Sequence, residues 1–171
     1  QTDGKNAFNS LNRTTMLGQV AEAVPELFPA LKTLLGGPTL YFDSSGNMQE
    51  SFSGCVQGDP LSMPLCALTI AKAIMQAEVR CISFADDNHI IGNSKEEAVA
   101  SVKRFIEVLK RQHKGLLMTK IKGHSSDLPS GDATTATLPE LPNEGKWVRC
   151  LHGLGTILGG TPARKVEVDT K

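Results

Sequence analysis

Apolar residues recur at the spacing of an amphipathic helix in the first part of the chain. The stripe extends over residues 10–35, and Pro25 divides it, because a proline inside a helix removes a hydrogen bond and clashes with the preceding turn. Gly36–Pro38 follow and end the second piece. A further apolar stretch, residues 61–79, is too long for a typical strand and favours another helix. The first stripe consists of Leu11, Met16, Leu17, Val20, Ala21 and Val24.

The best-defined helix is predicted to run from Ser94 to about Lys114 and to stop at Gly115. Ser94 suits the N-cap position, and Glu97 stands three residues later, where its side chain can reach back to the start of the helix. One face of this helix is apolar. Its members are Val99, Val102, Phe105, Ile106 and Leu109.

Two pairs of short segments predict β-hairpins. Thr39–Asp43 and Met48–Ser53 are joined by Ser44–Asn47, a sequence that suits a turn. Arg80–Ala85 and Asn88–Gly92 flank two acidic residues, which we expect at the tip of a tight hairpin. Strands interleaved with helices predict an α+β domain, in which helices cover one face of a mostly antiparallel sheet.

Composition and charge narrow the class of protein. With 171 residues, 40% of them hydrophobic and 21% charged, the chain can bury the core of one domain and is not a disordered tail. The net charge of zero excludes a strongly polycationic protein. Residues 1–93 carry five basic and nine acidic residues, whereas residues 94–171 carry thirteen and nine. The basic residues gather between positions 103 and 122, which indicates the solvated face of a helix or, as the alternative, a phosphate-binding track.

The cysteines and the hydropathy pattern indicate an intracellular protein. Cys55, Cys66, Cys81 and Cys150 form no CxxC pair and have no zinc-ligand spacing, so free thiols in a reducing compartment are expected. No apolar run is long enough to cross a membrane, and no secretory leader is recognisable. The chain begins at Gln1 without an initiator Met, from which we expect a piece of a longer polypeptide.

Three segments carry residues that folding alone does not require. Asp3–Asn9 places an acid five positions ahead of an aromatic residue. Gly54–Ser62 is a loop whose glycines allow a close approach of the backbone. Phe84–Asp87 ends in two adjacent carboxylates, which repel one another unless a cation or solvent neutralises them. Hard oxygen ligands of this kind suit Mg²⁺, and a third carboxylate from another strand would complete a two-metal site for phosphoryl transfer.

Together these segments resemble motifs A, B and C of reverse transcriptases, and the non-LTR retrotransposon enzymes in particular. Asp3–Phe8 is similar to motif A, Gln57–Leu61 to motif B and Phe84–Asp87 to motif C, in the family's order. Gly115–Lys122 resembles the segment that follows the palm helix, and Leu154–Gly160 resembles the strand toward the primer grip. The chain departs from the family pattern at Met63, at Thr119 and at Asn88–His89.

The resemblance implies a metal site. Asp3 and Asp86 would bind two Mg²⁺ ions, with Mn²⁺ as an alternative, and Asp87 would support them. Gly4 would offer its backbone carbonyl to one of the ions. The implied reaction is the addition of a dNTP to a primer 3′-hydroxyl on an RNA or DNA template.

The resemblance also implies substrate contacts. Phe8 would lie under the sugar of the incoming nucleotide and exclude a 2′-hydroxyl, which disfavours the related RNA-directed RNA polymerases. Gln57 and Gly58 would contact nucleotide and template. Lys122 would lie near the triphosphate or near the sheet that supports it.

The likeness extends over most of the chain but concerns only the polymerase palm. We expect a palm core in residues 1–122, a flexible loop in 123–145 and the end of the palm in 146–171. Fingers and thumb would belong to the parent polypeptide, so this fragment alone is expected to be inactive. A nuclear location follows if the host is a eukaryote, and no membrane partner is expected. The alternative is a non-catalytic relic or nucleic-acid-binding remnant of a retroelement.

Overall fold

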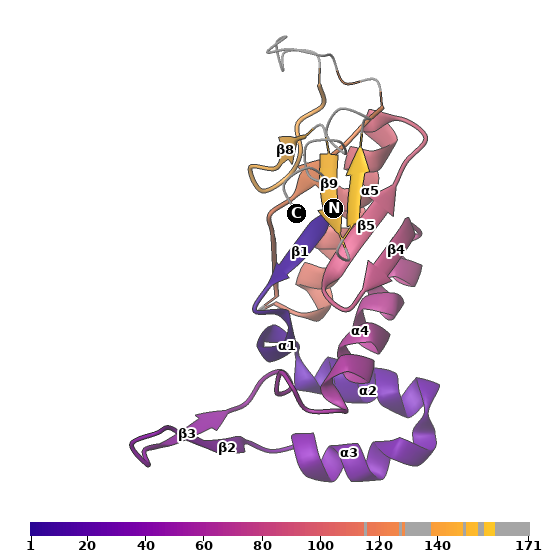
Figure 1. Ribbon diagram of the computed structural model, residues 1–171. Helices are drawn as coiled ribbons and strands as arrows, with labels where there is room; N and C mark the ends of the chain where they lie inside the picture. Colours follow the sequence, from indigo (N-terminus) through magenta and orange to yellow (C-terminus); the bar gives the residue numbers. More distant parts are fainter. Residues whose placement is uncertain (115, 127, 129–137, 149, 154–155, 160–171) are drawn as a thin grey trace.

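A four-stranded antiparallel sheet is the centre of the fold in the computed structural model (Figure 1). The structure describes residues 1–114, 116–126, 128, 138–148, 150–153 and 156–159. The strand order is β4-β5-β1-β6, and every neighbouring pair is antiparallel. The strands are β1 (Thr2–Lys5), β4 (Arg80–Phe84), β5 (Asp87–Ile91) and β6 (Leu117–Thr119).

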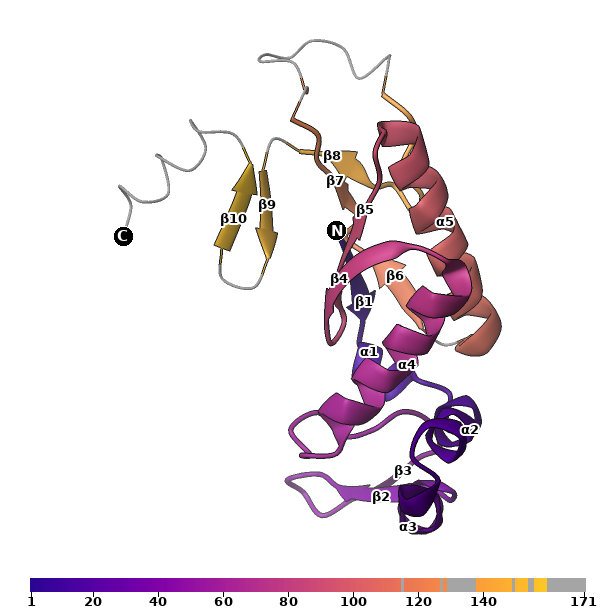
Figure 2. The same ribbon diagram turned by 90° about the vertical axis from the view of Figure 1, so that its right-hand side faces the viewer.

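Two long helices, α4 (Ser62–Ala77) and α5 (Lys95–Gln112), pack against this sheet and lie on one side of it (Figure 2). The apolar face predicted for α5 is buried, and Phe105 and Leu109 are completely enclosed. The sheet with its covering helices confirms the α+β class. It also explains the core, because a sheet and an amphipathic helix each have one apolar face to bury.

The start of α5 is capped as predicted, with one difference. The Ser94 hydroxyl accepts a hydrogen bond from the Glu97 backbone N–H at 3.1 Å. The Glu97 carboxylate, however, accepts from the backbone N–H of Asn93 at 2.8 Å, one residue before the N-cap. The helix ends at Gln112, and Gly115 lies outside the described residues.

The predicted helical stripe of residues 10–35 is divided at Pro25. Helix α2 (Arg13–Ala23) comes first, then the 3₁₀ turn η1 (Pro25–Leu27), then α3 (Phe28–Leu35). The Asn12 side chain caps α2 by accepting from the Thr15 N–H at 2.9 Å. A four-residue helix, α1 (Ala7–Ser10), precedes it and was not predicted, because one turn is too short to show a period.

The first predicted hairpin is present as β2 (Thr39–Phe42) and β3 (Met48–Ser51), and it projects away from the sheet (Figure 1). Arg13, a buried residue, fastens its base. Nε donates to the Gly54 carbonyl at 2.8 Å, and the two terminal nitrogens donate to the Gly37 carbonyl at 2.6 Å and to Oγ1 of Thr39 at 2.8 Å. The hairpin, α2 and the loop at Gly54 are thus joined by one side chain.

Two smaller strand pairs complete the described part of the chain. β7 (Lys122–Gly123) pairs with β8 (Lys146–Trp147) in parallel, and β9 (Cys150–Gly153) pairs with β10 (Thr156–Gly159) in antiparallel orientation. Much of the loop predicted for 123–145 lies outside the described residues, as do Leu154, Gly155 and Gly160 of the predicted strand. None of the described helices is long and apolar enough to span a membrane.

Candidate active site

The turn between β4 and β5 presents the acidic residues differently from the sequence expectation. Phe84 pairs with Asp87, which leaves Ala85 and Asp86 as the two residues of the turn. Asp86 is therefore at the tip, whereas Asp87 is the first residue of β5. The prediction that both acids form the tip was wrong by one residue, because strand pairing continues through Asp87. Ala85 has φ 51°, in the left-handed region that L-residues other than glycine rarely adopt.

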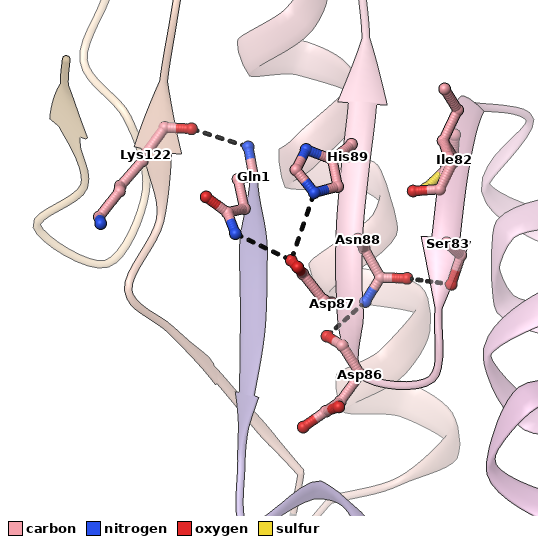
Figure 3. A network of polar contacts seen from close by, with 9 residues as sticks. Gln1, Ile82, Ser83, Asp86, Asp87, Asn88, His89 and Lys122 are labelled. Carbon is pink, nitrogen blue, oxygen red and sulfur yellow. Dashed lines mark hydrogen bonds and ion pairs between the residues drawn. The ribbon is translucent and has the colours of Figure 1, made fainter. Parts of the chain in front are cut away.

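Asn88 of β5 supports this turn through its side chain (Figure 3). Its side-chain amide donates to the backbone carbonyl of Asp86 at 2.8 Å, and its side-chain oxygen accepts from the Ser83 hydroxyl at 2.7 Å. The residue is fully buried. Both hydrogen-bonding ends of the amide are thus used to hold the two strands and the turn in one geometry.

Strand pairing brings Asp3 to the same sheet position as the acidic hairpin. Asp3 of β1 is the antiparallel partner of Asp87 on one side and of Thr119 on the other. Side chains of directly opposed residues project from the same face of a sheet. Asp3 and Asp87 therefore share a face, although 84 positions of sequence separate them.

The three carboxylates have different partners. The Asp87 carboxylate accepts a hydrogen bond from the side-chain amide of Gln1 at 3.0 Å and lies 3.5 Å from Nε2 of His89. The Asp86 carboxylate points away from Gln1, Asp87 and His89 (Figure 3). Asp3 forms an ion pair with Lys120, with 2.9 Å between Oδ2 and Nζ. Burial raises the pKa of Asp86, and repulsion from Asp3 and Asp87 raises it further. The ionised form of Asp86 is thus destabilised by its surroundings, and a bound cation would stabilise it.

A glycine allows the loop predicted as motif B to dock on α1. Gly54 has φ 64°, and a Cβ there would lie 2.2 Å from the Phe8 carbonyl oxygen. The Gly54 N–H donates to the Leu11 carbonyl at 2.7 Å, and the Cys55 N–H donates to the Phe8 carbonyl at 2.9 Å. The close approach expected of this loop is therefore made to the backbone of the first predicted segment.

A cavity of about 500 Å³ lies where these pieces meet, within the size range of small-molecule sites. It is lined by Phe8 from α1, by the loop that leads into α4, and by the β4–β5 turn. Five of the residues singled out in the sequence border it. They are Phe8, Gln57, Gly58, Asp86 and Asp87.

The other predicted residues lie outside the lining. Asp3 and Gly4 are in β1, near enough for Asp3 to perturb Asp86. Lys122 does not border the cavity: its backbone N–H donates to the Gln1 carbonyl at 2.9 Å beside the sheet. Lys120, to which the sequence assigned no role, contacts Asp3 instead. The contact of Lys120 depends on the pairing of β6 with β1 and on the left-handed backbone at Lys120, and the sequence reveals neither.

A larger cavity of about 840 Å³ lies toward the other end of β5. Its lining includes His89, Trp147 and the start of α5, and contains none of the predicted site residues. Size alone would favour this cavity. The chemistry favours the smaller one, because the carboxylate with a raised pKa is there.

The carboxylates of the candidate site suit a Mg²⁺ ion that is bound by only one or two protein ligands. Across the described residues, no three His, Cys, Asp or Glu side chains gather into a metal cage. Mg²⁺ in phosphoryl-transfer sites does not need one, because it is held by one or two carboxylates, by waters and by substrate phosphates. Asp3 and Asp86, close enough to repel one another, supply carboxylates of that kind.

No protein-family model matches the chain, and no curated protein matches it significantly. The functional argument therefore depends on the site itself.

Proposed function

We propose that this chain is the palm of an RNA-directed DNA polymerase of the non-LTR retrotransposon type. The observation that carries the proposal is the single cavity bordered by Phe8, by Gln57 and Gly58, and by Asp86 and Asp87. These residues come from three segments that resemble reverse-transcriptase motifs in sequence. Their meeting around one space supports a common role, because catalytic and binding groups must lie within reach of one bound substrate.

In this proposal the carboxylates bind the metal ions. Asp3 and Asp86 would hold two Mg²⁺ ions, and Asp87 and the Gly4 carbonyl would support them. The ions would activate the primer 3′-hydroxyl and stabilise charge on the transferred phosphoryl group. The buried side chain of Asn88 would hold the backbone of Asp86 in place at the end of the hairpin, and positioning of this kind is a large part of catalysis in phosphoryl transfer.

Phe8 would select the sugar. The side chain is partly buried, with one part against the core and another bordering the cavity. A rigid ring in that position would leave room for a deoxyribose and clash with a 2′-hydroxyl. Gln57, which also borders the cavity, would contact the nucleotide and the template.

The test is primer extension by the full natural polypeptide that contains this sequence, with dNTPs, a template–primer and Mg²⁺. We expect Asp86→Asn to reduce extension by several orders of magnitude, because it removes a metal ligand, while stability is kept or increased as repulsion is relieved. Glu50→Gln, which removes an exposed charge on β3, is the matched control and should extend normally. Near wild-type extension by Asp86→Asn contradicts the proposal. Template–primer binding without extension by the wild type supports the non-catalytic remnant instead.

A further inference from the structure

Lys120 has a conformation that takes its side chain out of the strand pattern. Strand β6 ends at Thr119, the partner of Asp3. Side chains alternate between faces along a strand, so a continued β6 would direct residue 120 away from the face of Asp3. Instead Lys120 has φ 50°, a left-handed conformation that is strained for a lysine, and its ammonium reaches the Asp3 carboxylate.

The contact is close but exposed to solvent. Nζ of Lys120 lies 2.9 Å from Oδ2 of Asp3, and the lysine side chain is 74% exposed while that of Asp3 is 32% exposed. Exposed ion pairs contribute little to stability, so the Lys120–Asp3 pair is not needed to hold the fold together. Its ammonium is a compact, mobile charge on a flexible chain and can leave the carboxylate at low cost.

Lys120 is also the basic side chain that contacts Asp3 in the described part of the chain. Asp87 is already occupied by Gln1 and His89. The two carboxylates proposed to bind metal are thus Asp3, paired with Lys120, and Asp86, which is partly buried beside it. A divalent cation that binds Asp3 would compete with the lysine ammonium for the same carboxylate.

We propose that Lys120 is a built-in counter-cation, which neutralises the Asp3–Asp86 pair and is displaced when a divalent cation binds. This inference rests on the proposed function, because it assumes that these carboxylates are the metal ligands. It adds that metal affinity is set by competition with a tethered ammonium, in addition to the ligands themselves. Lys120 would be a positioning residue, with no contact to the reacting atoms.

Direct measurement of Mn²⁺ binding to the 171-residue chain tests this, with free Mn²⁺ followed by electron paramagnetic resonance. Lys120→Met keeps the length of the side chain and removes its charge, and we expect it to bind Mn²⁺ about three- to tenfold more tightly than wild type. Lys103→Met removes an exposed charge from α5 and is the matched control, with unchanged affinity expected. Equal or weaker binding by Lys120→Met overturns the inference.

Thermal melts give a second readout that does not require polymerase activity. In EDTA, Lys120→Met should melt close to the wild-type temperature, because an exposed ion pair contributes little to stability. Mg²⁺ should raise its melting temperature more than that of wild type, since a tighter ligand stabilises more at equal concentration. Asp3→Asn separates the two proposals. Binding that depends on Asp3 but not on Lys120 overturns only the counter-cation. Binding that depends on neither residue overturns the metal site as well.

Discussion

The side-chain amide of Asn88 donates to the backbone carbonyl of Asp86, 2.8 Å away, from a fully buried position on β5. The same amide accepts from the Ser83 hydroxyl, so one side chain links both strands of the hairpin to its tip. Asn88 is one of the positions at which the sequence departs from the reverse-transcriptase pattern. The side chain at this position has a structural role here, because the Asn88 amide makes two hydrogen bonds that a smaller or apolar residue could not make.

Replacing Asn88 by Ala should therefore destabilise the protein. We expect a loss of about 1–3 kcal/mol in the free energy of unfolding, because the Asp86 carbonyl loses a buried partner. Urea unfolding measures it. Asn93→Ala is the matched control: Asn93 is exposed and accepts one bond from Arg80, and its loss should change stability by no more than about 0.5 kcal/mol. Equal effects of the two substitutions would show that the buried amide does not support the turn.

Two glycines with positive φ separate backbone strain from steric contact. At Gly46, with φ 82°, a Cβ would meet no atom within 4 Å, so Gly46→Ala should cost about 1–2 kcal/mol from strain alone. At Gly54, with φ 64°, a Cβ would also collide with the Phe8 carbonyl, so Gly54→Ala should cost about 3 kcal/mol or more. Chemical denaturation of both variants makes the comparison. Similar losses would mean that the loop is not docked on α1 as described.

His113 predicts a dependence of stability on pH. Burial lowers its pKa to about 4, and its Nδ1 accepts from the Asn12 N–H at 3.1 Å. The unfolded chain, with an ordinary histidine pKa near 6.5, therefore binds more protons between about pH 4 and 6.5. Stability should fall as the pH is lowered through this window, by about 2 kcal/mol between pH 7.5 and 5 from this residue.

The variant His113→Asn isolates this contribution. An asparagine side-chain oxygen can accept the same backbone hydrogen bond but does not titrate. Its unfolding free energy should fall less steeply between pH 7.5 and 5 than that of wild type, while other groups contribute equally to both. An unchanged slope would assign the acid sensitivity elsewhere.

Phe8→Val in the full natural polypeptide tests the sugar gate. We expect discrimination between dNTP and rNTP to fall by about 10- to 200-fold, since one steric contact is worth about 1–3 kcal/mol. Steady-state incorporation of both sugars, with a thermal melt alongside, measures it. A large drop in melting temperature with an unchanged dNTP/rNTP ratio would instead assign Phe8 to the core alone.

The sequence predicted elements whose signals are local. The apolar face and the Ser94 cap of α5, the break at Pro25 and both hairpins depend on residues within a few positions of one another, and the structure confirms them. The register that sets Asp3 opposite Asp87 and Thr119 was not predictable, because it depends on pairing across 84 and 116 positions. The left-handed backbone that brings the Lys120 ammonium to Asp3 was not predictable either, and the sequence therefore indicated Lys122 instead of Lys120.

The central position of β1 has a consequence for the order of folding. Its two partners, β5 and β6, follow it by more than 80 residues, so during synthesis β1 remains an unpaired strand while the intervening helices emerge. Closing such long loops is slow, whereas α4, α5 and the β4–β5 hairpin depend on local contacts and can form first. Amide protection in β1 should therefore appear last in a pulsed hydrogen-exchange refolding experiment. A partly folded chain would accordingly have its acidic hairpin in place before Asp3 arrives beside it.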